Sequence, residues 1–209
     1  MGKTGASRVY ILGRRLSALG DAARSIGSCA IPIECDVTQP ASVAAAVAKV
    51  EQEVGYIDVL INNAGILGPD HKSANTAGSI DELQQLLLAD SDKWAPTFAI
   101  NSTAVVGVSA AFLKLLDAGN KRRGWESGKL EDRARKRDTY GLSEKGIAAD
   151  DKRSSQIITV ASIAGLNRFI TAGLAYGASK AAAISLGKAL AHLLAPWGIR
   201  SNIINPGSE

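Results

Sequence analysis

Residues 57–65 read Ile57-Asp58-Val59-Leu60-Ile61-Asn62-Asn63-Ala64-Gly65. The apolar first half, rich in β-branched residues, is typical of a buried strand, and a turn of asparagines and small residues follows it directly. Short apolar strands that alternate with helix-length segments predict a parallel sheet built from right-handed βαβ crossovers. The expected fold class is therefore α/β.

Strands and helices are expected to alternate on both sides of this stretch. The strands are expected at 8–12, 31–37, 57–61, 155–162 and 200–205, and the helices at 16–26, 40–54, 94–116 and 176–194. Pro32 favours an edge position for the second strand, because a missing N–H costs no ladder bond there. Ligands of such sheets bind at the carboxyl ends of the strands, where Asp36, Asn63, Ser162 and Asn205-Pro206-Gly207 all fall.

Composition limits the class of protein. No apolar run approaches the ~18–20 residues that span a bilayer, and no apolar leader is present, so we expect neither a transmembrane helix nor a signal peptide. Cys29 and Cys35 are too few for a disulfide framework, which makes a cytoplasmic location the expectation. His71 and His192 are too few and too far apart to predict a metal site.

The formal net charge of +4 lies within one segment. Residues 121–153 hold 11 Lys and Arg against 7 Asp and Glu, whereas the remainder of the chain is balanced. We expect a polar charged insert at about 119–154, a solvated loop or frayed helix within a single domain that spans 1–209. A nucleic-acid or anionic-surface patch is the alternative, although Trp125 and Tyr140 alone make a poor stacking platform. The working expectation is no nucleic acid and no membrane.

The strongest chemical motif is Tyr176-Gly177-Ala178-Ser179-Lys180. Positions i and i+4 share a helix face, so the phenol and the ammonium can address one site. A phenol with a pKa near 10 is a poor acid–base catalyst at neutral pH, and a nearby ammonium favours the phenolate and lowers such a pKa. Alone, the spacing is weak evidence, and an ordinary surface pair is the alternative.

Two further polar residues strengthen the motif. Ser162 closes the preceding strand, where a hydroxyl can donate to a carbonyl oxygen that gains negative charge, although a turn or cap is the alternative. Asn101 lies inside the long expected helix, a poor place for asparagine because its side chain competes for backbone hydrogen bonds. Asn101 therefore either caps backbone groups locally or binds a water molecule with a functional role.

The order of these motifs resembles the short-chain dehydrogenase/reductase family. The resemblance rests on Asn62-Asn63-Ala64-Gly65, Asn101, Ser162, Tyr176 with Lys180, and Asn205-Pro206-Gly207, and it covers residues 5–120 and 154–207. The chain looks especially like fungal and 3-oxoacyl reductase-like members. The resemblance implies a Rossmann-like doubly wound parallel sheet that lacks the first βα unit and the C-terminal helix and strand.

The resemblance also implies roles for individual residues. Tyr176 would be the proton donor in reduction and the base in oxidation, and Lys180 would bind the nicotinamide ribose and tune Tyr176. Ser162 would polarise the substrate carbonyl, and Asn101 would hold a relay water. The remaining cofactor contacts would come from Asp36 and Val37 near the adenine, from Asn63, Ala64 and Gly65 along the cofactor, and from Pro206 and Gly207 near the nicotinamide.

The coenzyme is expected to be NADP(H) rather than NAD. NAD sites place a carboxylate near the ribose 2′-OH, whereas NADP sites place arginine nearby. Leu12-Gly13-Arg14-Arg15 contains no acid, and paired guanidinium groups suit a 2′-phosphate. Surface arginines at a helix start are the alternative.

The predicted function is an NADP(H)-dependent oxidoreductase that interconverts a ketone and a secondary alcohol by hydride transfer, with a small-molecule carbonyl or alcohol substrate. The family's pairing of helices implies a homo-oligomer, a dimer or tetramer. No glycine-rich phosphate loop follows any expected strand. The alternative is therefore an inactive member of the family that at most binds homologous subunits.

Overall fold

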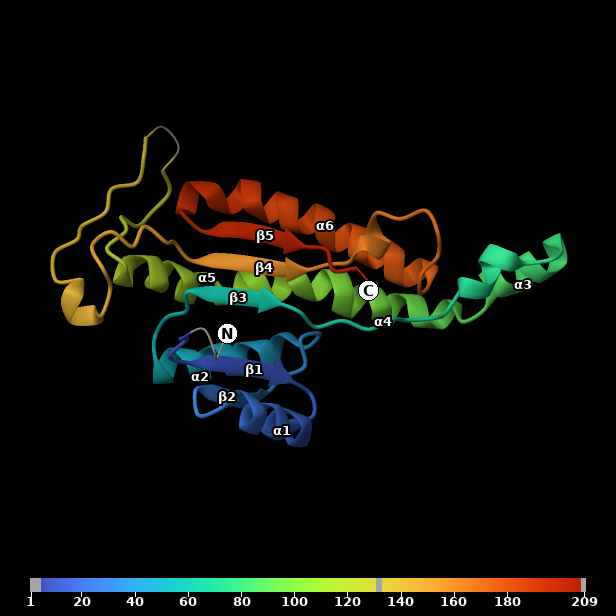
Figure 1. Ribbon diagram of the computed structural model, residues 1–209, viewed down its shortest axis with the longest axis horizontal. Helices are drawn as coiled ribbons and strands as arrows, with labels where there is room; N and C mark the ends of the chain where they lie inside the picture. Colours follow the sequence, from blue (N-terminus) through green and yellow to red (C-terminus); the bar gives the residue numbers. More distant parts are fainter. Residues whose placement is uncertain (1–4, 131–132, 208–209) are drawn as a thin grey trace. The chain divides into compact units, whose positions relative to one another are not determined.

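The computed structural model describes residues 5–130 and 133–207, and the chain divides into two compact units, Met1–Gly55 and Tyr56–Glu209. In each unit, parallel strands alternate with helices (Figure 1). This confirms the expected Rossmann-like α/β fold class. The single domain expected over 1–209 stays a prediction.

The first unit is a two-stranded parallel sheet with two helices. Its elements are β1 (Val9–Gly13), α1 (Leu16–Ile26), β2 (Ala30–Glu34) and α2 (Pro40–Glu53). Pro40 starts α2, where a missing N–H leaves no helical bond unmade. Val43, Ala46 and Val50 form the buried face of α2 at helical spacing. Pro32 lies in β2, which is an edge strand of this two-stranded sheet, as its missing N–H predicts.

The second unit is built on a three-stranded parallel sheet. The strands β3 (Val59–Asn62), β4 (Gln156–Val160) and β5 (Arg200–Ile204) are paired in that order. Two long helices, α5 (Ala104–Arg122) and α6 (Leu174–Leu194), run alongside the strands (Figure 1). α5 packs on β3, α6 packs on β5, and the two helices contact each other. The carboxyl ends of the three strands therefore meet the first turns of α6 at one edge.

Small residues bring α6 close to its sheet. Ala183 and Ile184 of α6 form a buried cluster with Ala161, against which Ile203 of β5 packs. A Cβ added to Gly187 would lie only 2.6 Å from Cγ1 of Ile203, so α6 approaches β5 more closely than a side chain would permit. This close packing holds α6 directly against β5.

The long helix expected at 94–116 is interrupted. It consists of α4 (Trp94–Phe98), a π-helical turn (Ala99–Thr103) and α5. A π turn accommodates one extra residue per turn, and such turns are frequent at functional sites. By length and composition, the run Ser91–Arg122 would suffice to cross a membrane, a candidate that we did not expect from the sequence. Half of its most apolar 18-residue window is buried within the protein.

One helix was not expected. α3 (Ile80–Leu88) begins after Ser79, whose hydroxyl accepts a hydrogen bond from the Glu82 N–H at 3.1 Å. The Glu82 carboxylate accepts in return from the Gly78 N–H at 2.8 Å. Ser79-x-x-Glu82 is thus a capping box, a signal that precedes helices in sequences. None of the residues of α3 is buried.

The described part of the charged insert is largely irregular chain with many exposed residues, and a few of its side chains are anchored. Its first residues complete α5, and the side chains of Leu142 and Ile147 are buried. Arg123, with a nearly covered side chain, binds Asp58 at 2.9 Å and Asp151 at 2.5 Å. Ion pairs and arginine–carbonyl bonds, which leave no apolar periodicity in the sequence, anchor this loop at several points. The separate insert stays a prediction.

Candidate active site

The loop after β3 is held against α5 and approaches two candidate site residues. The Asn62 amide donates to the Ser109 hydroxyl at 2.9 Å, which anchors the end of β3 on α5. A Cβ added to Gly65 would lie 3.3 Å from Oδ1 of Asn101 and 3.5 Å from Nζ of Lys180. The Asn63-Ala64-Gly65 turn therefore passes directly beside both residues, and its own side chains are exposed.

Asn101 lies in the π-helical turn and is almost fully buried. Its Oδ1 accepts from the Ile66 N–H at 2.9 Å, and its Nδ2 donates to the Ile66 carbonyl at 2.8 Å. The second Nδ2 hydrogen goes to the Ser179 hydroxyl at 2.9 Å. Both amide hydrogens are thus committed, and the side chain ties the loop after β3 to α6. These partners are 35 and 78 residues away in the sequence, so the contacts are tertiary, and the relay water stays a prediction.

Tyr176 and Lys180 lie one turn apart on α6, as their spacing predicts. Nζ of Lys180 lies 5.8 Å from the centre of the Tyr176 ring and donates to the Val160 carbonyl at 2.8 Å. The Lys180 side chain is 4% exposed, and burial lowers the pKa of its ammonium. An ammonium has three donors, so two N–H groups remain after the bond to Val160.

Ser162 lies two residues beyond the end of β4. Its oxygen accepts a hydrogen bond from the Ala164 N–H at 3.1 Å, which caps a short helical turn. This bond leaves the hydroxyl hydrogen free to point elsewhere. The Ile163 N–H donates to the Pro206 carbonyl at 3.1 Å, and Gly207 approaches the Ile163 side chain. The structure thus places the end of β5 beside the turn that carries Ser162.

The second unit therefore assembles most of the predicted residues at one sheet edge. Asn101, Gly65 and Lys180 meet directly, Lys180 reaches Val160 beside Ser162, and Tyr176 lies on the same helix face as Lys180. An arrangement of phenol, ammonium and hydroxyl around the carboxyl ends of parallel strands suits proton transfer to or from an oxygen atom.

The predicted coenzyme residues of the first unit form a separate group. Arg14 and Arg15 follow β1 and are exposed, and Asp36 and Val37 follow the neighbouring strand β2. The Thr38 hydroxyl and N–H bind the Asp36 carboxylate and, with a smaller effect from the Arg14 charge, lower the pKa of Asp36. The group lies at the carboxyl ends of β1 and β2, the edge at which the parallel-sheet rule places ligands.

Two further residues of this network were not singled out from the sequence. The buried Ser179 hydroxyl donates to the Tyr176 carbonyl at 2.8 Å, and the Ser102 hydroxyl donates to the Ser179 carbonyl at 2.9 Å. The available signal was their position, because Ser102 follows Asn101 and Ser179 precedes Lys180. A hydroxyl in a helix interior is a weak signal on its own.

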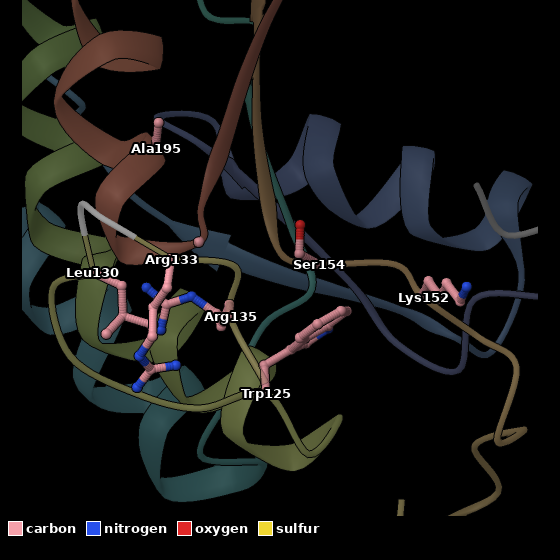
Figure 2. A pocket seen from close by; sticks show the side chains of 8 residues that line it. Trp125, Leu130, Arg133, Arg135, Lys152, Ser154 and Ala195 are labelled. Carbon is pink, nitrogen blue, oxygen red and sulfur yellow. The ribbon is translucent and has the colours of Figure 1, made fainter. Parts of the chain in front are cut away.

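A cavity of about 260 Å³ lies elsewhere in the second unit (Figure 2). Its lining includes Trp125, Arg133, Arg135 and Ser154. Ser154 lies two residues before the start of β4, so the cavity borders the amino end of that strand, whereas Ser162 follows its carboxyl end. Arg133 is paired with Glu126, and Arg135 donates to the carbonyls of Gly128 and Pro196. Both arginines thus bind groups of the protein itself. The lining includes none of Asn101, Ser162, Tyr176 and Lys180, so the cavity is separate from the candidate active site.

Comparisons with known proteins identify the family. The family model for short chain dehydrogenases matches residues 1–124 and 142–208. The short-chain dehydrogenase/reductase VdtF of Byssochlamys spectabilis is 38% identical over 207 residues, which cover 96% of this chain and 65% of VdtF. The chain thus spans slightly less than two thirds of that relative.

Solved structures show the same fold. An NAD+-bound xylitol dehydrogenase is 27% identical with a TM-score of 0.68, over 96% of this chain and 60% of that one. The NADP complex of RhlG from Pseudomonas aeruginosa also has a TM-score of 0.68, at 22% identity over 97% of this chain and 62% of RhlG. The strand-end residues, the Tyr176-to-Lys180 motif and the matching family model lead to one conclusion: the chain belongs to the short-chain dehydrogenase family.

Proposed function

We propose that this chain forms the catalytic part of an NADP(H)-dependent oxidoreductase that interconverts a ketone and a secondary alcohol. The observation that carries the proposal is the cluster at the carboxyl edge of the second sheet, where Gly65, Asn101 and Lys180 meet beside the helix turn of Tyr176. Membership of the family supports the class of reaction. The substrate would be a small-molecule carbonyl or alcohol.

Three side chains would handle the proton and the oxygen. The Tyr176 phenol would give its proton to the carbonyl oxygen in reduction and take it back in oxidation. The free hydroxyl hydrogen of Ser162 would donate to the same oxygen and stabilise its developing negative charge. Asn101 would hold the loop after β3 in a fixed position relative to α6 through its hydrogen bonds to Ile66 and Ser179.

The residues of the second unit fit a nicotinamide ribose. Lys180 retains two N–H donors for hydroxyl groups, and the absence of a side chain at Gly65 leaves room beside its ammonium. NADP(H), when bound, would supply or accept the hydride. In the first unit, Arg14 and Arg15 have the chemistry to bind a 2′-phosphate, and Asp36 and Val37 would lie near the adenine.

We extend the proposal to pairing of two copies. Val106 on α5 and Leu193 on α6 leave 39% and 62% of their surfaces exposed, although both helices otherwise bury apolar faces. What supports the pairing is the family resemblance, which implies that these two helices pair between copies; two single exposed side chains do not by themselves mark a contact surface. Size-exclusion chromatography with light scattering distinguishes a dimer or tetramer from a monomer.

Turnover of NADPH tests the proposed function. The purified chain is mixed with NADPH and a panel of ketones that includes 3-oxoacyl thioesters, and loss of NADPH absorbance is followed. Ketone-dependent oxidation is the expected result, with NADPH and no ketone as the control. Binding of NADPH without turnover of any ketone would contradict catalysis and favour the inactive alternative. In a fluorescence titration with NADPH and with NADH, no binding of either coenzyme would contradict the coenzyme assignment as well.

A further inference from the structure

Ser179 is the most connected hydroxyl at the candidate site. Its side chain is completely buried on the face of α6 that meets the π-helical turn. The hydroxyl donates to the Tyr176 carbonyl at 2.8 Å and accepts from the Asn101 amide at 2.9 Å. One oxygen therefore links the turn that carries the phenol to the asparagine that holds the loop after β3.

The π-helical turn directs two successive side chains to this one residue. Asn101 binds the Ser179 hydroxyl, and Ser102 binds the Ser179 carbonyl at 2.9 Å. Successive residues of a regular α-helix point about 100° apart, so both reaching one residue is unusual. The extra residue of a π turn changes this local geometry. Two successive residues of the π-helical turn thus form hydrogen bonds with Ser179.

We propose that Ser179 is a positioning residue that couples the Asn101 amide to the first turns of α6 and so fixes Tyr176 and Lys180 relative to the loop after β3. The inference rests on the proposed function for its kinetic consequence only. Its structural consequence stands on the hydrogen bonds that join Ser179, Asn101 and Ile66.

Loss of the Ser179 hydroxyl should also weaken the hydrogen bond between Asn101 and Ile66, which Ser179 does not itself form. Without Ser179 Oγ, one Nδ2 hydrogen of the buried Asn101 has no acceptor, and a buried donor without a partner destabilises its surroundings. Asn101 also accepts from the Ile66 N–H, so its displacement weakens that bond. The exchange rate of the Ile66 amide hydrogen therefore reports on Ser179.

The first arm of the test measures hydrogen exchange in Ser179→Ala, Ser179→Thr and the control Ser155→Ala. Ser155 is equally buried but lies at the amino end of β4, where its hydroxyl contacts the Ile57 carbonyl. Exchange at Ile66 should rise about three- to tenfold in Ser179→Ala, as loss of one neutral hydrogen bond implies, and stay unchanged in Ser155→Ala. Ser179→Thr should restore the wild-type rate, because a helical threonine hydroxyl can bond the carbonyl three residues earlier.

The second arm measures steady-state kinetics of the same variants. Ser179→Ala should lower kcat about tenfold and leave KM for the ketone within about threefold, because misplaced groups slow the chemical step more than substrate binding. Ser179→Thr should recover kcat, which a purely structural loss of packing would not predict. Ser155→Ala should keep both constants.

The outcomes separate this inference from the proposed function. Wild-type exchange at Ile66 in a folded Ser179→Ala protein overturns the coupling, as does an equal rise in Ser155→Ala. If Ser179→Ala does not fold, Ser179→Cys, a weaker donor of similar size, takes its place. Faster exchange in Ser179→Cys than in Ser179→Thr then supports the coupling, and equal rates overturn it. Absence of turnover in the wild type contradicts the proposed function, while the exchange arm still decides the role of Ser179.

Discussion

The Lys180 ammonium donates a hydrogen bond to the Val160 carbonyl, with 2.8 Å between the two atoms. This bond joins α6 to the last residue of β4, two positions before Ser162. Lys180 is only 4% exposed, so its positive charge has lost most of its contact with water, which is unfavourable for the charged form. Burial accordingly lowers the pKa of Lys180. A charge kept in such a place is typical of a functional site rather than of a stabilising contact.

Replacing Lys180 by Met should preserve stability and damage binding. The folded pKa lies below the ordinary value of 10.5, so between these two values the unfolded chain binds more protons than the folded chain. The unfolding free energy of the wild type should therefore rise with pH across that window, and Lys180→Met should lose this rise. At neutral pH, the unfolding free energies of the variant and the wild type should differ by at most about 1 kcal/mol. The variant loses one hydrogen bond, but it no longer has to bury a charge, and the two effects oppose each other. NADPH affinity should fall.

Urea unfolding of both proteins from neutral pH to about pH 10 measures this difference. The comparison cancels the other groups that titrate in that range. Identical pH dependence of the two unfolding free energies would show that the Lys180 ammonium is solvated. Wild-type NADPH affinity in the variant would remove Lys180 from the coenzyme site.

Replacing Tyr176 by Phe should abolish turnover and leave the fold intact. The Ser179 hydroxyl binds the backbone carbonyl of Tyr176, not its phenol, so the variant keeps that contact. Loss of a positioned acid lowers the rate about 10²–10⁴-fold. NADPH affinity should stay within about threefold, since Lys180 keeps its bond to Val160. Steady-state kinetics and a fluorescence titration measure the two effects. Turnover within about threefold of the wild type would exclude the phenol as proton donor.

The sequence predicted the strands and the two long helices because apolar periodicity records burial directly. In α2, the periodicity of Val43, Val47 and Val50 predicted the helix; Val43 and Val50 are buried, Val47 is half-buried, and Ala46 completes the buried face. It also predicted that Asn101 is special, because asparagine is a poor helix former. The π-helical turn around Asn101 was not predicted, and Asn101 contacts Ser179, which lies 78 residues away in the sequence. Tertiary hydrogen bonds of this kind leave no local pattern.

The charged insert shows which contacts composition leaves out. Its composition predicted a solvated loop, and within that loop Arg137 donates to the Arg123 carbonyl at 2.9 Å and to the Ala149 carbonyl at 2.6 Å. The same guanidinium lies over the Trp125 ring, 5.6 Å from its centre. A charge count cannot distinguish a guanidinium in water from one that binds backbone carbonyls. The pairing of arginines with particular carbonyls becomes visible only when the chain is folded.

Replacing Arg123 by Met should destabilise the second unit. Arg123 binds Asp58 and Asp151, and its removal leaves the nearly buried Asp151 with Arg153 alone. Breaking a buried ion pair costs about 3–5 kcal/mol, but Asp58 is more than a third exposed and Arg153 remains, so we expect about 2 kcal/mol. Lys121→Met, which breaks the exposed pair with Asp117, is the matched control and should change stability by at most about 0.5 kcal/mol. Equal effects in urea unfolding would contradict this assignment.

The same network should contribute to acid unfolding. Hydrogen bonds from Arg153, and then the interaction with Arg123, hold the pKa of Asp151 well below its ordinary value of 3.8. A carboxyl whose folded pKa is depressed stabilises the folded state above the ordinary value, and that stability is lost as the pH falls toward the folded value. Asp151→Asn should therefore reduce the loss of stability below about pH 4.

Two glycines of α5 should respond in opposite directions to alanine. A Cβ at Gly119 would clash with the Ile57 carbonyl oxygen and the Ser155 hydroxyl, whereas a Cβ at Gly107 meets nothing within 4 Å. Gly119→Ala should lower the unfolding free energy by about 1–3 kcal/mol, because backbone has to move. Gly107→Ala should raise it by about 0.5–1 kcal/mol through helix propensity. Thermal unfolding of both variants provides the comparison, and stabilisation by Gly119→Ala would show that α5 is not pressed against Ile57.

Coenzyme choice should depend on the turn after β1. Arg14 and Arg15 are exposed there, and the strand ends in Gly13, where an NAD site would need a carboxylate. One guanidinium in reach of a 2′-phosphate adds a charge-assisted hydrogen bond, so kcat/KM should favour NADPH over NADH roughly 10–150-fold. Gly13→Asp combined with Arg14→Ala should reverse the preference, because a carboxylate repels the phosphate and accepts from the ribose hydroxyl. Arg24→Ala is the control, since Arg24 lies on α1 and is paired with Asp21. Equal use of both coenzymes by the unaltered protein would show that Arg14 and Arg15 are surface charges only.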